Sequence, residues 1–338
     1  MWNTVGHHKA VKFLGNTLQA GKSFHSYLIA GPPHVGKMTL ALDLASALNC
    51  LGKNKPCGNC RSCIRITDKL HADVQVVGLD SEKQSLEQGG VSIKIDHIRN
   101  LKRESSLKPF EGYHRVFILD GIEDMKEEAS NSLLKILEEP PGNVVMILLT
   151  SNITKVLSTI VSRCQLLELR AVPKRDIVDL LQSTYKCDDT RSDQIARLSG
   201  GRTGWAIDAC SHPDILEDIQ VQFSSIEAVV DGDMEYRFNY ATYLADSYSK
   251  NRIIGRDELR IWLVWWRDVL LIKEGAQELI SNLSGIDRTR RIAFGLSSLQ
   301  IIRAIRDLQD VTQYLESNVN PRLALQNLML ILPVPTSR

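Results

Sequence analysis

The sequence has no long apolar run. Residues 1–23 contain no uninterrupted hydrophobic stretch of the kind that a secretion signal needs. The most apolar later segment, Ile261 to Ile272, is interrupted by Arg267 and Asp268. A signal peptide and a membrane-spanning helix are therefore not expected, and we predict a cytoplasmic protein with no membrane partner.

The sequence also lacks an excess of charge of either sign. It has 41 Lys and Arg against 40 Asp and Glu, for a formal net charge of +1. A protein that binds nucleic acid on its own is usually basic, so this balance argues against a free-standing DNA-binding module. Any contact with DNA should be local or shared with partner subunits.

Cysteine is scarce outside one cluster. Seven cysteines in 338 residues without a secretion signal do not indicate a disulfide framework. Four of them have the spacing C-x6-C-x2-C-x2-C: Cys50, Cys57, Cys60 and Cys63. Pairs two residues apart can reach one tetrahedral zinc ion, and a site with four protein ligands is closed and structural. An iron–sulfur cluster and unrelated thiols are the alternatives, although the proline that often follows the last cluster cysteine is absent.

The composition is that of a globular protein with more than one core. Apolar residues make up 43% of the chain and charged residues 24%, as is ordinary for soluble domains. At 338 residues the chain should form two or three domains of roughly 100–200 residues each.

The apolar pattern divides the chain into three parts. In residues 1–170, short runs rich in Val, Ile and Leu alternate with helical patterns, which favours an α/β domain with a mostly parallel, doubly wound sheet. The runs are Tyr27–Ala30, Val74–Val77, Val116–Leu119, Val144–Thr150 and Leu166–Leu169. Residues 171–212 predict a small helical domain with a break at Gly200-Gly201, and residues 213–338 predict an all-helical domain. Its last helix should begin at Asn320-Pro321, a cap followed by a first-turn proline.

A glycine-rich loop follows the first run. Residues 31–37, GPPHVGK, open a helix, which is the setting in which backbone N–H groups cradle phosphates. Lys37 would reach the terminal phosphates, but the Ser or Thr whose hydroxyl should bind magnesium is replaced by Met38. The next residue, Thr39, points about 100° away around the helix. The nucleotide-binding residues of this degenerate loop would be Gly31, Gly36, Lys37 and Thr39, together with Asp120.

The end of the third run carries a second defect. Asp120 can face a magnesium ion. The next residue is Gly121, whereas ATPases with such a phosphate loop can carry there a glutamate that activates water. Glu123 and Asp124 should start the following turn. Phosphoryl transfer needs metal, oriented water and charge stabilisation together, so we expect weak or no ATP hydrolysis by this chain. ATP or ADP could bind without hydrolysis, or the loop could survive only as a turn.

Several stretches resemble one known family. Residues 131–141, NSLLKILEEPP, followed by Ser162-Arg163-Cys164, are similar to the signature of bacterial DNA-polymerase clamp-loader subunits. So are residues 25–28, the cysteine cluster after the loop's helix, residues 95–99 and residues 318–325. The resemblance covers nearly the whole chain.

The resemblance implies a fold, partners and a role for one arginine. It implies an AAA+ domain with a zinc knuckle at residues 50–63, a helical lid, and an all-α collar domain for oligomerisation. Motor and delta subunits would be the partners in a heteropentamer that loads a sliding clamp onto primed DNA. Arg163 would be an arginine finger that acts on a neighbour's ATP, whereas a lone arginine without this context would be an ordinary surface residue. Met38 and Gly121 place the chain with the subunit type that hydrolyses little or no ATP.

Three further expectations follow from the same resemblance. Gly204 stands where motor subunits keep a phosphate-facing arginine, although Arg202 is close by. The apolar face that includes Ile301, Ile305 and Leu308 should pack into the collar, whereas Trp262, Trp265 and Trp266 are favoured as an internal core. Lys94, Arg99 and Lys102 could meet DNA phosphates in the assembly, with a solvated helix face as the alternative.

Two other functions remain open. A catalytically active motor subunit would show ATPase activity in the isolated chain that depends on Lys37. A stand-alone zinc-dependent nucleic-acid-binding protein would bind DNA without partners and lose that binding on chelation.

Overall fold

The structure is a computed structural model, and it describes residues 2–78, 93–140, 142–282, 285–317 and 319–335. Residues 141 and 318, which belong to two of the stretches that carry the family resemblance, lie outside these ranges, as does the end of the predicted 213–338 domain. The chain divides into two compact units, Met1–Thr184 with Ser199–Ala206, and Tyr185–Leu198 with Ile207–Arg338. The three-domain division at residues 170 and 212 stays a prediction.

A parallel sheet of five strands forms the centre of the first unit. Its strand order is β2-β3-β4-β1-β5. The strands are β1 (Ser26–Ala30), β2 (Val74–Gly78), β3 (Arg115–Asp120), β4 (Val144–Thr150) and β5 (Gln165–Glu168). All five predicted runs are confirmed as strands to within one residue at each end.

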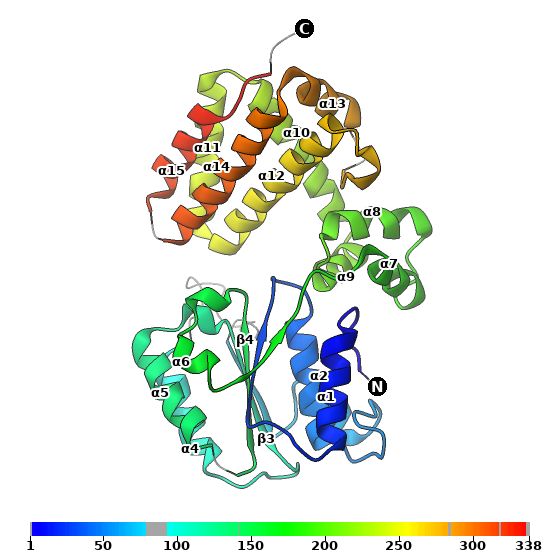
Figure 1. The fold of residues 1–338 in the computed structure, drawn as a ribbon, viewed down its shortest axis with the longest axis vertical. Coiled ribbons are helices and arrows are strands. Elements are labelled where there is room, and N and C mark those ends of the chain that lie inside the picture. The colour runs from blue at the N-terminus through cyan, green and yellow to red at the C-terminus, as the bar shows by residue number, and fades with distance from the viewer. Residues whose placement is uncertain (1, 79–92, 141, 283–284, 318, 336–338) are drawn as a thin grey trace. The chain divides into compact units, whose positions relative to one another are not determined.

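Helices cover both faces of this sheet, so its central strands are buried along their length. One face carries α1 (His8–Gln19) and α2 (Lys37–Asn49), and the other carries α4 (Ile95–Ser105), α5 (Glu127–Glu138) and α6 (Ser158–Val161), as Figure 1 shows. Every residue of β1 and β4 is buried, which is why these strands read as continuous apolar runs. The loop after β1 opens α2, and the predicted AAA+-type α/β fold class is confirmed. The remaining elements of this unit are α3 (Arg61–Thr67), η2 (Ile122–Asp124), η3 (Ile153–Lys155) and α7 (Lys174–Ser183).

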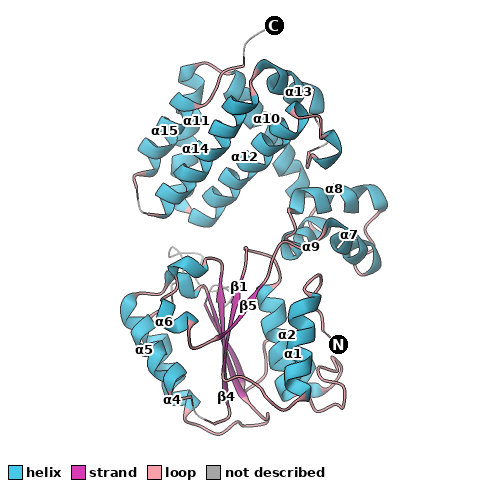
Figure 2. Ribbon diagram, viewed as in Figure 1, coloured by secondary structure: helices cyan, strands magenta, loops and turns pink. Residues whose placement is uncertain are grey.

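The described residues of the second unit are helical, with no strand among them (Figure 2). The elements from α8 onward are α8 (Asp189–Ser199), α9 (Thr203–Ser211), α10 (Asp214–Asp231), α11 (Met234–Lys250), α12 (Arg252–Lys273), η4 (Gln277–Leu279), α13 (Ile286–Gly295), α14 (Ser298–Glu316) and α15 (Pro321–Ile331). The predicted break between α8 and α9 is present, with Gly200 and Gly201 at positive φ. Asn320 caps α15 by accepting hydrogen bonds from the N–H groups of Arg322 and Leu323, as predicted. None of the helices in the described ranges combines the length and apolarity needed to cross a lipid bilayer.

The core of the second unit contains residues that we expected at a subunit interface. Ile301 and Leu308 are fully buried, because α14 packs against α12 and α15 of the same chain. The expectation that this face packs into a collar is therefore wrong for these two residues. The three tryptophans of α12 are at most 1% exposed, which confirms them as internal core.

Candidate functional site

The side chain of Lys37 lies folded into the phosphate loop. Its ammonium group donates to the carbonyl oxygens of Gly31 at 2.7 Å and Pro32 at 2.9 Å, and to Ser151 Oγ at 3.0 Å. A lysine ammonium has three N–H donors, and each of them finds an acceptor here. Lys37 is 8% exposed, and it links the start of the loop to the end of β4.

Two carboxylates act on the charge of Lys37: Asp120, the last residue of β3, and Glu123 of η2. Burial lowers the pKa of Lys37, and the carboxylates of Asp120 and Glu123 oppose that shift. Glu123 also accepts a hydrogen bond from the Ser151 N–H at 2.9 Å. Asp120 thus lies beside Lys37, as an acidic partner of the loop should, and Glu123 fixes the end of β4.

The two residues after Lys37 differ in exposure. Met38 is partly buried, and Thr39, the third residue of α2, is exposed. Thr39 was predicted among the loop residues, and its exposure agrees with the rotation expected between adjacent positions of a helix. Gly31 and Gly36 shape the loop, and Gly36 lies at a φ of 104° that an L residue rarely adopts.

The backbone at Gly121 has a conformation that favours glycine. It lies at φ 80° and ψ 40°, in the left-handed region, directly after Asp120. A side chain at this position is strained regardless of its chemistry. The turn that leads from β3 to η2 therefore disfavours a glutamate at this position.

We predict that Gly121→Glu does not create an ATPase. The substitution should destabilise the protein by about 1–2 kcal/mol, the cost of an L residue in the left-handed region. Thermal denaturation and phosphate release measure the two effects. Gly15→Ala is the control, because Gly15 lies inside α1 with open space for a Cβ and should stabilise the protein by about 1 kcal/mol. A variant as stable as the parent, with new magnesium-dependent turnover, would contradict this reading of the turn.

The start of α9 is bonded to the phosphate loop. The Gly204 N–H donates to the His34 carbonyl at 2.8 Å, and a Cβ on Gly204 would meet that oxygen at 3.2 Å. An arginine at position 204 would thus crowd the loop. Arg202 is 7% exposed, donates from Nε to the Ser199 carbonyl at 2.8 Å and lies over the ring of Trp205. These two contacts are with its own segment.

The four clustered cysteines meet at one point. Their Sγ atoms lie within 4.8 Å of one another, and Cys57 and Cys63 are 3.9 Å apart. A tetrahedral zinc with Zn–S bonds of about 2.3 Å needs sulfurs about 3.8 Å apart. Backbone N–H groups point at the sulfurs, including those of Gly52 and Cys57 toward Cys50 Sγ at 3.3 Å. The cluster can hold a metal ion, and its geometry fits zinc.

The surroundings of the sulfurs shift the pKa values of Cys60 and Cys63 in opposite directions. Burial alone would raise the pKa of the Cys60 thiol, but N–H groups of Cys63 and Leu51 that bond the sulfur lower it to about 6. Burial raises the pKa of Cys63 to about 12. A bound cation would favour the thiolate form of all four.

Arg163 lies at the opposite end of the sheet from the phosphate loop. The Ser26 hydroxyl, at the start of β1, donates to the Arg163 carbonyl at 2.8 Å, whereas the loop begins after Ala30. Five strand residues span about 16 Å, more than an arginine side chain reaches. Arg163 is half-exposed and pairs with Glu138 at 2.7 Å. It cannot serve the loop of its own chain.

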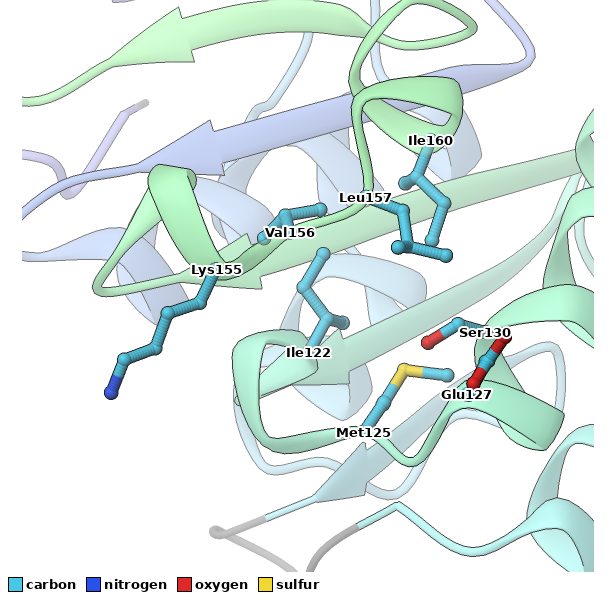
Figure 3. Close-up of a pocket in the computed structure, with 8 residues that line it drawn as sticks. All are labelled: Ile122, Met125, Glu127, Ser130, Lys155, Val156, Leu157 and Ile160. Atoms are coloured by element: carbon cyan, nitrogen blue, oxygen red, sulfur yellow. The ribbon is translucent and has the colours of Figure 1, made fainter. Parts of the chain in front are cut away.

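An apolar pocket of about 220 Å³ lies beside the segment that leads to Arg163. Figure 3 shows Ile122 and Met125 facing Leu157 and Ile160 across it, with the ammonium group of Lys155 directed away. The other lining residues are Glu127, Ser130 and Val156. None of the predicted nucleotide-loop residues lines this pocket, so it is separate from the phosphate loop.

The predicted DNA-facing residues lie at the start and along α4. Lys94 precedes the helix, and Arg99 and Lys102 are exposed on it. Arg99 pairs with Asp96 at 3.3 Å. Their contact with DNA stays a prediction.

Two contacts of the candidate site were missed at the level of sequence. We assigned Glu123 to the next turn, yet its carboxylate reaches the end of β4, and we gave Glu138 no role. Glu138 belongs to residues 131–141, which carry the family resemblance. Its partner Arg163 lies 25 positions later, between α6 and β5, and sequence spacing alone does not predict a contact between them.

The sequence of the chain is similar to those of DNA polymerase III subunits. Residues 6–173 match the family model described as DNA polymerase III, delta subunit. The chain is 28% identical over 327 residues to DNA polymerase III subunit delta' of Bacillus subtilis, covering 96% of this chain and 95% of that protein. It is 34% identical over 204 residues to subunit gamma/tau of Mycobacterium tuberculosis, covering 58% of this chain and 34% of that protein. A crystal structure of a gamma-subunit-related protein of Thermotoga maritima matches at 18% identity and a TM-score of 0.46, covering 94% of this chain and 97% of that chain.

Proposed function

Because the chain belongs to the family of DNA polymerase III clamp-loader subunits, we propose that it acts as the delta-prime type of subunit. In this role it is a scaffold without effective ATPase activity. It supplies Arg163 in trans to the ATP of a neighbouring motor subunit, so that hydrolysis there depends on assembly. The assembly, a heteropentamer with motor and delta subunits, loads a sliding clamp onto primer–template DNA.

The position of Arg163 carries this proposal. It lies beside the start of β1, whereas the phosphate loop follows the end of the same strand. An arginine there can stabilise phosphoryl transfer only for a nucleotide held by another chain. The chain's own loop keeps Lys37 and Asp120 but has Met38 and Gly121 at the positions for the metal-binding hydroxyl and the base.

The remaining parts have supporting roles in this proposal. Cys50, Cys57, Cys60 and Cys63 would hold a structural zinc, which supplies no chemistry to ATP hydrolysis. A nucleotide could occupy the loop without turnover, held by backbone N–H groups and Lys37. Lys94, Arg99 and Lys102 of α4 would contact DNA phosphates in the assembly.

We predict that the isolated chain shows no magnesium-dependent ATP turnover above background. The reason is that the hydroxyl and the base needed to bind metal and orient water are both absent. Equilibrium ATP binding and phosphate release, each with and without magnesium, test this.

A motor subunit is the competing function, because the gamma/tau relative is 34% identical over its matched part. Turnover by the isolated chain that disappears in Lys37→Ala would favour the motor and overturn the proposal.

A further inference from the structure

The guanidinium group of Arg163 is held at two points of its own chain. One terminal nitrogen lies 2.7 Å from Glu138 Oε1, and the other donates to the Thr159 carbonyl at 3.0 Å. The side chains of Arg163 and Glu138 are 36% and 48% exposed. The group is therefore fixed on the surface while one side of it still faces solvent.

The two groups that bind the guanidinium, the Glu138 carboxylate and the Thr159 carbonyl, belong to helices with buried residues. Glu138 is the last residue of α5, whose preceding residues Ile136 and Leu137 are at most 3% exposed. Thr159 lies in α6, which is anchored by Ile160 at 2% exposure, one of the residues shown in Figure 3. The backbone of Arg163 is fixed in turn by its bond from Ser26. The contacts thus tie the guanidinium to a rigid frame.

This arrangement leaves the guanidinium able to bind phosphate. It has five N–H donors, and its contacts with the described residues use two of them, so three have no partner among those residues. Because the ion pair is partly exposed, a neighbour's phosphate can reach the guanidinium without first breaking the contacts that orient it. A free arginine side chain would lose much of its rotamer entropy on ordering, and a side chain already held loses less.

We infer that Glu138 is a positioning residue for Arg163. It acts through Arg163, together with the Thr159 carbonyl, by holding the guanidinium in one orientation before the neighbour's nucleotide arrives. The inference rests on the proposed function, in which Arg163 serves a neighbouring subunit.

The test is ATP turnover by the reconstituted assembly containing variants of this chain. At the motor site that faces Arg163, Glu138→Ala should lower kcat roughly three- to ten-fold and leave KM for ATP unchanged, because orientation matters in the transition state. The total rate of the assembly should fall by less than it does in Arg163→Ala. Glu138→Gln keeps an oxygen acceptor for the guanidinium and should restore most of the rate. Glu139→Ala is the matched control, since Glu139 is exposed and forms no ion pair with the described residues.

Each other outcome has a distinct meaning. If Arg163→Ala lowers turnover but Glu138→Ala leaves it unchanged or raises it, the positioning inference is wrong and the proposed function stands. If Glu138→Gln is as slow as Glu138→Ala, hydrogen-bonded positioning is also wrong. If Arg163→Ala itself has no effect, the proposed function fails independently of Glu138.

Discussion

Replacing Cys63 with serine should abolish zinc binding by the four-cysteine cluster and unfold the knuckle. Cys63 is 1% exposed and its sulfur lies 3.9 Å from that of Cys57. Its thiol is therefore an interior member of the four-sulfur cluster. A structural zinc contributes to folding free energy, because its ligands are assembled only in the folded state. The knuckle starts at Cys50, directly after α2, and Asn49 at that junction accepts hydrogen bonds from the N–H groups of Tyr113 and His114. Loss of the metal should therefore disturb the loop that leads into β3.

Metal analysis and thermal denaturation measure this effect. The parent should carry about one zinc per chain, and the variant almost none, with a melting temperature lower by roughly 10 °C for a loss of about 3 kcal/mol. Cys210→Ser is the control, because Cys210 lies outside the cluster and should leave the zinc content unchanged. A parent protein free of metal, or one that carries iron and sulfide, would refute the zinc assignment.

Arg163→Ala should produce the largest loss of activity in the assembly. An arginine supplied in trans contributes about 10³–10⁵ to the rate where it has been measured. At the motor site that faces Arg163 we expect a fall of about 10³-fold. The total rate should fall less, since other motor sites would use arginines from other subunits. Clamp- and DNA-stimulated phosphate release measures the total rate.

The matched control is Arg175→Ala. Arg175 lies on α7, its side chain is 90% exposed, and its contact with Asp179 is long, at 3.9 Å. This variant removes the same charge from the same unit and should keep the parent's rate. Equal losses in the two variants would mean that the effect comes from surface charge and not from the position of Arg163.

The strands and the meeting of the four cysteines were predictable because their signals are local. Buried parallel strands are apolar throughout, and four cysteines at short spacings can meet at one point through the turn geometry alone. Asn320-Pro321 likewise gave the start of α15, because a helix cap needs only the residues next to it.

The burial of α14 and the surroundings of Arg163 were not predictable in this way. An apolar face such as that of Ile301 and Leu308 looks the same in sequence whether it packs within its own chain or against another. The pairing of Glu138 with Arg163 depends on where α5 ends relative to the start of β5, a tertiary relation. The left-handed conformation of Gly121 was equally hidden, since a glycine in sequence does not reveal its φ.

The most direct test compares Lys37→Ala and Arg163→Ala in otherwise identical reconstituted assemblies. Clamp- and DNA-stimulated ATP turnover is measured for each, beside the parent. The account predicts that Lys37→Ala keeps the parent's turnover, because this chain's own loop does not hydrolyse ATP, and that Arg163→Ala loses most of the turnover at the neighbouring site. The opposite pattern, with turnover lost in Lys37→Ala and kept in Arg163→Ala, would contradict it.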